Sequence, residues 1–262
     1  MSFPPTDHNS VPRFPRLRTI GARAGCCAGL VGITLVTAGC SVKGADNANL
    51  IVGKQTFVAK CGSCHTLARA NTKGLVGPNL DEAFRASIDE GLERDSVRGV
   101  VEEQVKIPNP EGAMPKELIS GNKLKDVAAY VAQVVARSGK DTGLLATAVE
   151  APGAGKPAVE KSGKLQIAAS PSGQLAYVTS KATASAGAVT VEMPNMSGVS
   201  HNIAIEAGSK GASGSGPVLG ASQFITKGSA TVKVNLKPGT YTYFCQAPGH
   251  RAAGMYGTIT VK

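Results

Sequence analysis

Residues 244–255 read FCQAPGHRAAGM, and this stretch decides the fold of the C-terminal part of the chain. It lies between two strand-like runs, YTYFC and MYGTITVK, and it spaces Cys245, His250 and Met255 as C-x4-H-x4-M. A thiolate, an imidazole and a thioether in one loop are ligand types that soft and borderline metal ions prefer. The sequence therefore predicts a metal site in the loop that joins two β-strands.

A fourth ligand is available upstream, where His201 opens the run HNIAIEA. One thiolate and two imidazoles in a plane, with a weak thioether above, make a blue-copper electron-transfer site. Zinc is the rival metal, although it favours a tetrahedral set without a thioether. The remaining alternative is a buried free cysteine with two surface histidines. We expect one type 1 copper, held by the ligands His201, Cys245, His250 and Met255.

The sequence around these ligands has the pattern of short β-strands. Six β-branched, alternating runs follow Lys164, separated by Gly, Pro, Ser and Asn: LAYVTSK, AVTVEMP, HNIAIEA, ATVKVNL, TYTYFC and GTITVK. This spacing predicts a small antiparallel sandwich of about 100 residues. Together with the ligand set, residues 164–262 resemble a cupredoxin of the plastocyanin–auracyanin kind. The resemblance implies an all-β Greek-key sandwich in which Asn202 braces the cysteine loop.

A second motif, CGSCH, occupies residues 61–65. Two thiols at this spacing can form thioethers to the two vinyl groups of one porphyrin, while the following His65 ligates the iron. The alternative is a thioredoxin-like thiol pair, which belongs in a βαβ setting and does not need the histidine. We expect one covalent haem c attached through Cys61 and Cys64.

The second axial ligand of this haem is predicted from the histidine and methionine inventory. The chain has four histidines, and the three besides His65 lie in the leader or in the copper motif. Met114, in the polar loop NPEGAMPKEL, is the only methionine between residues 2 and 192. A thioether opposite a histidine closes the iron coordination and raises its potential. The alternative role for Met114 is packing.

Residues 41–138 have helical rather than β periodicity. NLIVGKQTFVAK and GNKLKDVAAYVAQVVARSG read as helices at the two ends, with DSVRGVVEEQVK as a shorter helix between them. With CGSCH and Met114, this segment resembles a class I cytochrome c, which implies an all-α domain. The resemblance further implies that Gly53, Phe57 and Tyr130 lie where the terminal helices cross, and that Pro78 backs the proximal face of the haem.

The chain thus divides into a leader (1–40), a cytochrome c domain (41–138), a linker (139–163) and a cupredoxin domain (164–262). The linker reads GKDTGLLATAVEAPGAGKPAVEKSG, a composition typical of a flexible coil. In the leader, residues 24–38 are apolar and follow four arginines, as in a signal peptide. TAGC, at 37–40, resembles a bacterial lipoprotein processing site with Cys40 as the lipidated residue, although Thr37 stands where Leu is usual. Ordinary cleavage and an uncleaved anchor remain alternatives, and all three export residues 41–262.

The formal net charge is +10. From Lys164 onward the chain has eight basic and two acidic residues. A basic C-terminal half suits docking to an acidic protein or a membrane surface, and an ordinary soluble basic domain is the alternative. The charges are scattered and no nucleic-acid-binding motif is present, so nucleic acid is not expected as a partner.

The ligand count points to electron transfer without substrate chemistry. A catalytic copper enzyme needs further histidines, a haem enzyme needs an open iron position, and this chain offers neither. We therefore expect a membrane-tethered carrier on the outer face of a bacterial cytoplasmic membrane, with no small-molecule substrate. It would pass single electrons from a quinol-oxidising complex to a terminal oxidase or a nitrogen-oxide reductase. Two alternatives stay open: a peroxidase-like haem enzyme with a labile Met114, and a copper-binding or copper-delivery protein.

Overall fold

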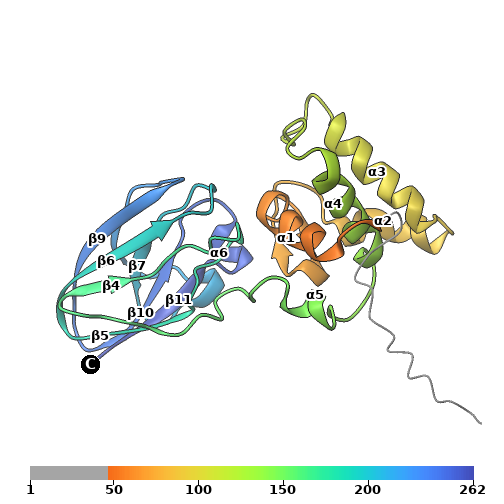
Figure 1. The fold of residues 1–262 in the computed structure, drawn as a ribbon. Helices are drawn as coiled ribbons and strands as arrows, with labels where there is room; N and C mark the ends of the chain where they lie inside the picture. The colour runs from red at the N-terminus through yellow and green to blue at the C-terminus, as the bar shows by residue number, and fades with distance from the viewer. Residues whose placement is uncertain (1–46) are drawn as a thin grey trace, which may run out of the picture. The chain divides into compact units, whose positions relative to one another are not determined.

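The computed structural model describes residues 47–262, which comprise a helical part followed by a β-sandwich (Figure 1). The expected leader, including Cys40 and its lipidation, lies outside the described residues. Within the described range, none of the helices combines the length and the apolar character needed to cross a bilayer.

Five helices make up the helical part: α1 (Leu50–Lys60), α2 (Leu80–Asp89), α3 (Arg94–Lys106), α4 (Gly121–Val134) and the short α5 (Leu144–Thr147). The helices predicted from periodicity correspond to α1, α3 and α4. The Asn49 side chain caps α1 by accepting hydrogen bonds from the backbone N–H groups of Ile51 and Val52. α2 was not expected, although Leu80, Phe84 and Ile88 recur at a spacing of four residues and pack against the core of the helical part.

Helices α1 and α4 cross in close contact, at the residues that the cytochrome resemblance implies. A Cβ at Gly53 would overlap the backbone carbonyl of Asp126 and would lie 2.9 Å from Tyr130 Cβ, so only glycine permits this approach. One turn further, the rings of Phe57 and Tyr130 pack with centroids 6.4 Å apart. Both aromatic side chains are fully buried, and they anchor the core of the helical part.

The helical part is not purely α-helical. Directly after CGSCH, β1 (Thr66–Leu67) pairs antiparallel with β2 (Thr72–Lys73), and a 3-10 turn at Ala68–Ala70 joins them. Asn71 closes this turn in the left-handed conformation, with φ 55°. The prediction of an all-α domain missed this hairpin because two-residue strands are too short to display alternation.

The segment 139–163 differs from the expected flexible coil. At its start, the buried Asp141 pairs with Lys54 Nζ at 3.0 Å and with Arg69 Nε at 2.8 Å. Lys54 Nζ also donates to the carbonyl of Leu145, so α5 is fastened to α1. At the other end, β3 (Ala158–Val159) joins the sandwich beside β5. Polar and backbone hydrogen bonds order this segment, and composition alone does not reveal them.

The β-sandwich consists of two sheets (Figure 1). The six-stranded sheet has the order β3-β5-β11-β10-β7-β8, and the three-stranded sheet has the order β4-β6-β9. The strands not yet given are β4 (Lys164–Gln166), β5 (Lys181–Ala184), β6 (Gly187–Asn195), β7 (Ala204–Ala207), β8 (Val218–Ala221), β9 (Gly228–Leu236), β10 (Gly239–Phe244) and β11 (Tyr256–Val261). Their inward side chains form one buried apolar cluster between the sheets.

Two strand predictions need correction. The run LAYVTSK at 175–181 was expected as a strand, but β5 starts only at Lys181 and the preceding residues make isolated bridges such as Ala169 with Tyr177. Their apolar alternation reflects burial in the core, which does not require a continuous ladder. The sandwich is also mixed rather than wholly antiparallel, because β5 pairs parallel with β11 and β4 with β6.

Candidate metal centres

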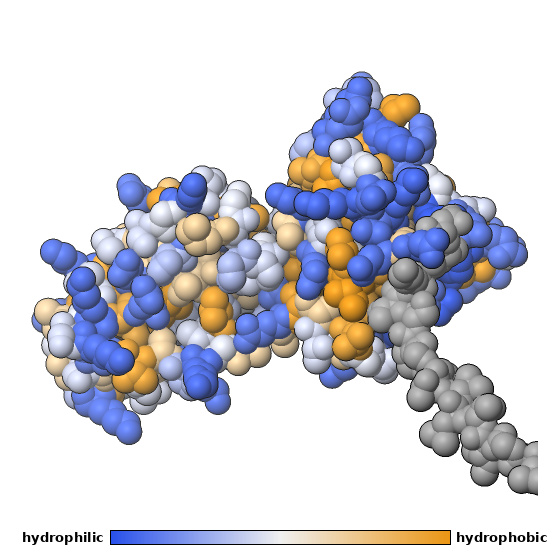
Figure 2. Space-filling model, viewed as in Figure 1, coloured by the Kyte–Doolittle hydropathy of each residue, from blue (hydrophilic) through white to orange (hydrophobic). Residues whose placement is uncertain are grey.

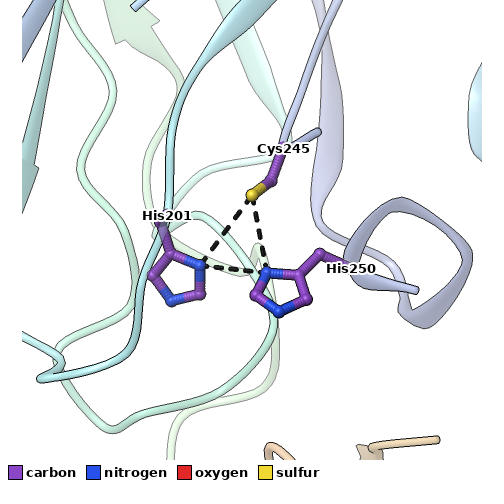
Figure 3. Close-up of side chains that lie close together, drawn as sticks. All are labelled: His201, Cys245 and His250. Atoms are coloured by element: carbon purple, nitrogen blue, oxygen red, sulfur yellow. Dashed lines mark hydrogen bonds between the residues drawn. The ribbon is translucent and has the colours of Figure 1, made fainter. Parts of the chain in front are cut away.

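Three donor side chains meet at one end of the sandwich (Figure 3). The Nδ1 atoms of His201 and His250 are 3.2 Å apart, and Cys245 Sγ lies 4.0 Å from the first and 3.4 Å from the second. Cys245 and His201 are buried and His250 is half-buried. Three of the four predicted copper ligands thus converge, although 44 residues separate Cys245 from His201.

Strand pairing brings these ligands together. Cys245 directly follows β10, and Met255 directly precedes β11, the antiparallel partner of β10. The backbone N–H of Cys245 donates to the Met255 carbonyl at 3.1 Å, which closes the ligand loop at its base. Met255 is fully buried in the sandwich core. His201 lies three residues before β7, whose Ala204 pairs with Phe244 of β10, and it forms an isolated β-bridge with Ile225.

Burial sets the protonation of the three donors. It lowers the pKa of His201 to about 4, with a further contribution from His250, and it also lowers the pKa of His250. Burial raises the pKa of the Cys245 thiol, while the backbone N–H groups of Asn202 and Ala247 partly oppose this rise. Both imidazoles are therefore neutral at pH 7 and carry a lone pair for a metal.

Asn202 braces the cysteine loop, as the cupredoxin resemblance implies. Its Oδ1 accepts the backbone N–H of Gln246 at 2.8 Å, and its Nδ2 donates to Gln246 Oε1 at 2.8 Å and to the Ser222 carbonyl at 3.2 Å. The buried hydroxyl of Tyr177 donates to the Asn202 carbonyl at 2.7 Å. Asn202, the residue after His201, is therefore hydrogen-bonded to Gln246, the residue after Cys245.

The donor chemistry of this cluster fits copper. The polar contacts of the His201 ring are to the other two donors, and its buried Nε2 has no hydrogen-bond partner among the described residues. A sulfur and two imidazole nitrogens, together with the buried Met255 at the end of the same loop, form the ligand set typical of a blue-copper site. A zinc site of the structural kind would favour a fourth strong donor, and Met255 does not supply one.

The helical part holds the other predicted metal-binding residues around one cavity. The cavity has a volume of about 490 Å³ and lies between α1, α2, α3, α4 and the loops that join them. Cys61, Cys64, His65 and Met114 all line it. Its remaining walls are mainly apolar, and they include Phe57, Leu80, Phe84, Val101, Val105, Val127 and Val131. This volume lies within the range of sites for cofactors and other small ligands.

His65 is oriented by the loop that follows the hairpin. Its Nδ1 lies 3.0 Å from the carbonyl of Pro78, which leaves Nε2 as the nitrogen free for a metal. A Cβ at Gly77 would lie 2.7 Å from His65 Nδ1, so glycine is required for the loop to pass this close to the ring. The position of Pro78 behind the ring agrees with the role that the cytochrome resemblance implies.

The cavity borders the surface. Large apolar side chains are exposed at its rim, namely Val76, Val100 and Leu118, and Figure 2 shows apolar side chains at the surface of the helical part among hydrophilic ones. Inside, burial and the neighbouring Cys64 raise the pKa of the Cys61 thiol to about 12.

One feature of the sandwich site was not expected from the sequence. Glu206, on β7, is buried and forms an ion pair with Arg251, the residue after His250, at 2.6 Å. Two features of the sequence could have pointed to this ion pair: a carboxylate within the apolar run HNIAIEA and an arginine within the ligand loop. Sequence alone did not link the two, because they are 45 positions apart in the chain and the β7–β10 pairing brings their segments together.

Comparison with known proteins agrees with this description of the sandwich. Residues 165–262 match the family model described as copper binding proteins, plastocyanin/azurin family. A search of curated proteins found no match.

Several solved structures are similar to the sandwich. Reduced auracyanin from the photosynthetic bacterium Roseiflexus castenholzii is 28% identical, over 39% of this chain and 99% of that chain, with a TM-score of 0.34. Auracyanin B is 25% identical over 42% and 96% of the two chains, with a TM-score of 0.32. Rusticyanin from Thiobacillus ferrooxidans is 22% identical over 40% and 82%, with a TM-score of 0.31.

The family match, the two-sheet sandwich and the convergent donors agree with one another. Residues 165–262 are therefore a cupredoxin domain of the plastocyanin/azurin family, with a site for one type 1 copper.

Proposed function

We propose that this protein is an extracytoplasmic electron carrier with two one-electron centres, a type 1 copper in the sandwich and a covalent haem c in the helical part. The observation that carries the proposal is the convergence of His201, Cys245 and His250, whose donor atoms all lie within 4.8 Å of one another. Copper, when bound there, supplies reversible one-electron exchange between its two oxidation states.

The residues of the sandwich suit a carrier because they hold the donor set rigidly. β10 and β11 fix the two ends of the ligand loop, and Asn202 ties the cysteine loop to the strand that carries His201. A site whose donors stay in place when the metal charge changes needs little rearrangement during electron transfer. The half-buried His250 is the ligand nearest to solvent, which makes its ring the natural point of electron entry and exit.

The haem proposal depends on the cavity of the helical part. Cys61 and Cys64 would attach the haem, His65 would ligate the iron through Nε2, and Met114 would ligate it from the other side. The hydrogen bond from His65 to the Pro78 carbonyl holds the ring orientation, and the apolar walls exclude water from the site. Haem, when bound, supplies a second one-electron couple.

The proposed location and partners come from sequence and charge. Export and a lipid on Cys40 would hold the protein at the outer face of the cytoplasmic membrane. The basic sandwich favours acidic redox partners, with a quinol-oxidising complex as donor and a terminal oxidase or nitrogen-oxide reductase as acceptor. The proposal includes no substrate chemistry, since the histidines of the described residues are all used by the two centres.

An optical redox titration of the purified full chain tests both centres. We expect a low-spin haem c spectrum with a sulfur–iron band and, separately, an intense blue thiolate–copper band, each titrating as one electron. Absence of the blue band after loading with Cu(II) would remove the copper carrier and favour copper delivery. A high-spin haem in the resting protein would favour the peroxidase-like alternative.

The substitution Met114→Ala tests the haem ligand. We expect loss of the sulfur–iron band and a lower haem potential, because the thioether raises the potential of the iron. The matched control is Met196→Ala, which removes an exposed methionine of the sandwich and leaves both spectra unchanged. An unaltered haem spectrum in the Met114 variant would mean that another group ligates the iron.

A further inference from the structure

The ligand loop of the sandwich carries a buried ion pair that the metal site itself does not use. Arg251 follows His250 in the four-residue helix α6 (His250–Ala253). Its guanidinium lies 2.6 Å from Glu206 Oε2, and the Glu206 side chain is 1% exposed. Apart from this contact, Glu206 Oε2 and Arg251 Nη2 have no hydrogen-bond partner among the described residues. Removing the partner of such a buried carboxylate is strongly destabilising, because an uncompensated charge is left in the interior.

The guanidinium makes three kinds of contact at once. In addition to the ion pair, Arg251 Nε donates to the Gly211 carbonyl at 2.9 Å. Its Cζ lies 4.1 Å from the centroid of the Phe244 ring, a cation–π contact with the residue before Cys245. Arg251, the residue after His250, therefore connects α6 to β7, to the 3-10 turn at Gly211–Ser213 and to the end of β10.

The Gly- and Ser-rich loop before β8 closes over this pair. The backbone N–H of Gly216 donates to Glu206 Oε1, which occupies the second carboxylate oxygen. A Cβ at Gly214 would overlap Arg251 Nη2, so the loop can cover the guanidinium only with glycine at this position. The sequence GSKGASGSG, which reads as an unremarkable loop, thus forms part of the enclosure around the ion pair.

His250 needs such support more than the other ligands do. Cys245 and His201 are buried; Cys245 directly follows β10 and His201 forms a β-bridge with Ile225, whereas His250 is half-buried and belongs to a helix of only four residues. Helices this short have little stability of their own in water. The contacts of Arg251 are therefore the main side-chain anchorage of α6 to the sandwich among the interactions described for that helix.

We propose that the Arg251–Glu206 ion pair is a positioning device that holds His250 in place beside the other two donors and so slows the loss of copper. The inference rests on the proposed copper site and adds a role for residues that contact no metal. Partners that orient ligands from behind commonly change metal affinity about 10- to 100-fold when they are removed.

The test measures the release of copper from the loaded full chain to an excess of a strong chelator, followed by the decay of the blue band. We expect Arg251→Met to release copper about 10- to 100-fold faster than the unmodified protein. Lys233→Met, which removes one positive charge from an exposed position on β9, should release copper at the unmodified rate. Equal rates in Arg251→Met and the unmodified protein would overturn the inference.

Two further variants separate positioning from general stability. The double variant Glu206→Leu with Arg251→Met leaves no buried unpaired charge, so its thermal stability should recover towards that of the unmodified protein. We expect fast copper release to persist, because the ion pair and the contacts of Arg251 with Gly211 and Phe244 are all missing. If copper retention recovers together with stability, the pair acts only through the fold and the inference is wrong.

Arg251→Lys covers the case in which Arg251→Met does not fold. Lysine keeps the charge but cannot make the ion pair and the Gly211 hydrogen bond together in the fork geometry of arginine. Release should still be faster than in the unmodified protein, and an unchanged rate would contradict the proposal. Failure of the copper site itself gives a different result, since the unmodified protein would then show no blue band at all.

Discussion

The donors of the sandwich contact one another, whereas those of the helical part surround a space. His201, Cys245 and His250 lie within 4.8 Å of one another because the paired strands β7, β10 and β11 bring the segments that carry them to one end of the sandwich. Cys61, Cys64, His65 and Met114 instead line a cavity of about 490 Å³ with apolar walls. The sandwich forms its site from its own hydrogen-bonded framework, whereas the helical part leaves a cavity that the proposed haem would fill.

The largest expected effect comes from removing the attachment thiols. In Cys61→Ser/Cys64→Ser we expect the helical part to lose most of its stability, since each large apolar side chain left uncovered forfeits about 1.5–3 kcal/mol and a whole domain has only about 5–15 kcal/mol. Far-UV circular dichroism should show reduced helix content, while the blue copper band should remain. This outcome would show that the helical part depends on an attached ligand for its stability and that the copper site of the sandwich does not.

The control for this experiment is Ser87→Ala, an exposed position on α2 outside the CGSCH motif. Its helix content and haem stain should match those of the unmodified chain. If the double serine variant keeps its helical signal and its resistance to proteolysis, the helical part is stable without its ligand. The proposed difference between the two parts would then be wrong.

The next effect concerns the sandwich without copper. Burial lowers the pKa of His201 from 6.5 to about 4, so the folded state binds a proton less readily than the unfolded chain does. This group therefore costs no stability above pH 6.5, and stability is lost as the pH falls towards 4. We expect a loss of about 2 kcal/mol between pH 7 and pH 5, measured by calorimetry on the chelator-treated protein.

In His201→Gln this pH dependence should be much weaker, because glutamine does not titrate. If the variant and the unmodified protein lose equal stability between pH 7 and pH 5, other groups are responsible. Burial in the sandwich would then not be what keeps the His201 imidazole neutral.

The smallest expected effect tests the helix crossing. Gly53→Ala forces a Cβ against the backbone of α4, and overpacking of this kind costs about 1–3 kcal/mol. The matched control is Gly99→Ala in α3, where a Cβ would meet nothing within 4 Å, so the gain in helix propensity should stabilise the helical part slightly. Thermal unfolding followed at the haem band measures both. A Gly53→Ala protein as stable as Gly99→Ala would show that the crossing is not tightly packed.

The C-x4-H-x4-M spacing and the long periodic helices depend on local geometry, which the residues display directly, and the cupredoxin resemblance added the distant His201. Haem attachment at CGSCH stays a prediction. The β1–β2 hairpin, the late start of β5, the parallel strand pairs and the ordering of Asp141 within the expected linker depend on partners elsewhere in the chain. Periodicity carries no information about such partners.

The sequence alone specified which residue types are available as ligands, the division into a helical and a β-rich part, and the spacing of the donors in the C-x4-H-x4-M loop and in CGSCH. Only the tertiary structure revealed that Glu206 pairs with Arg251, that β1 pairs with β2, and that Asp141 pairs with Lys54 and Arg69. The physical reason is that strand pairing joins residues that are distant in the chain, and burial then makes each enclosed charge or lone pair depend on the partner that the pairing supplies.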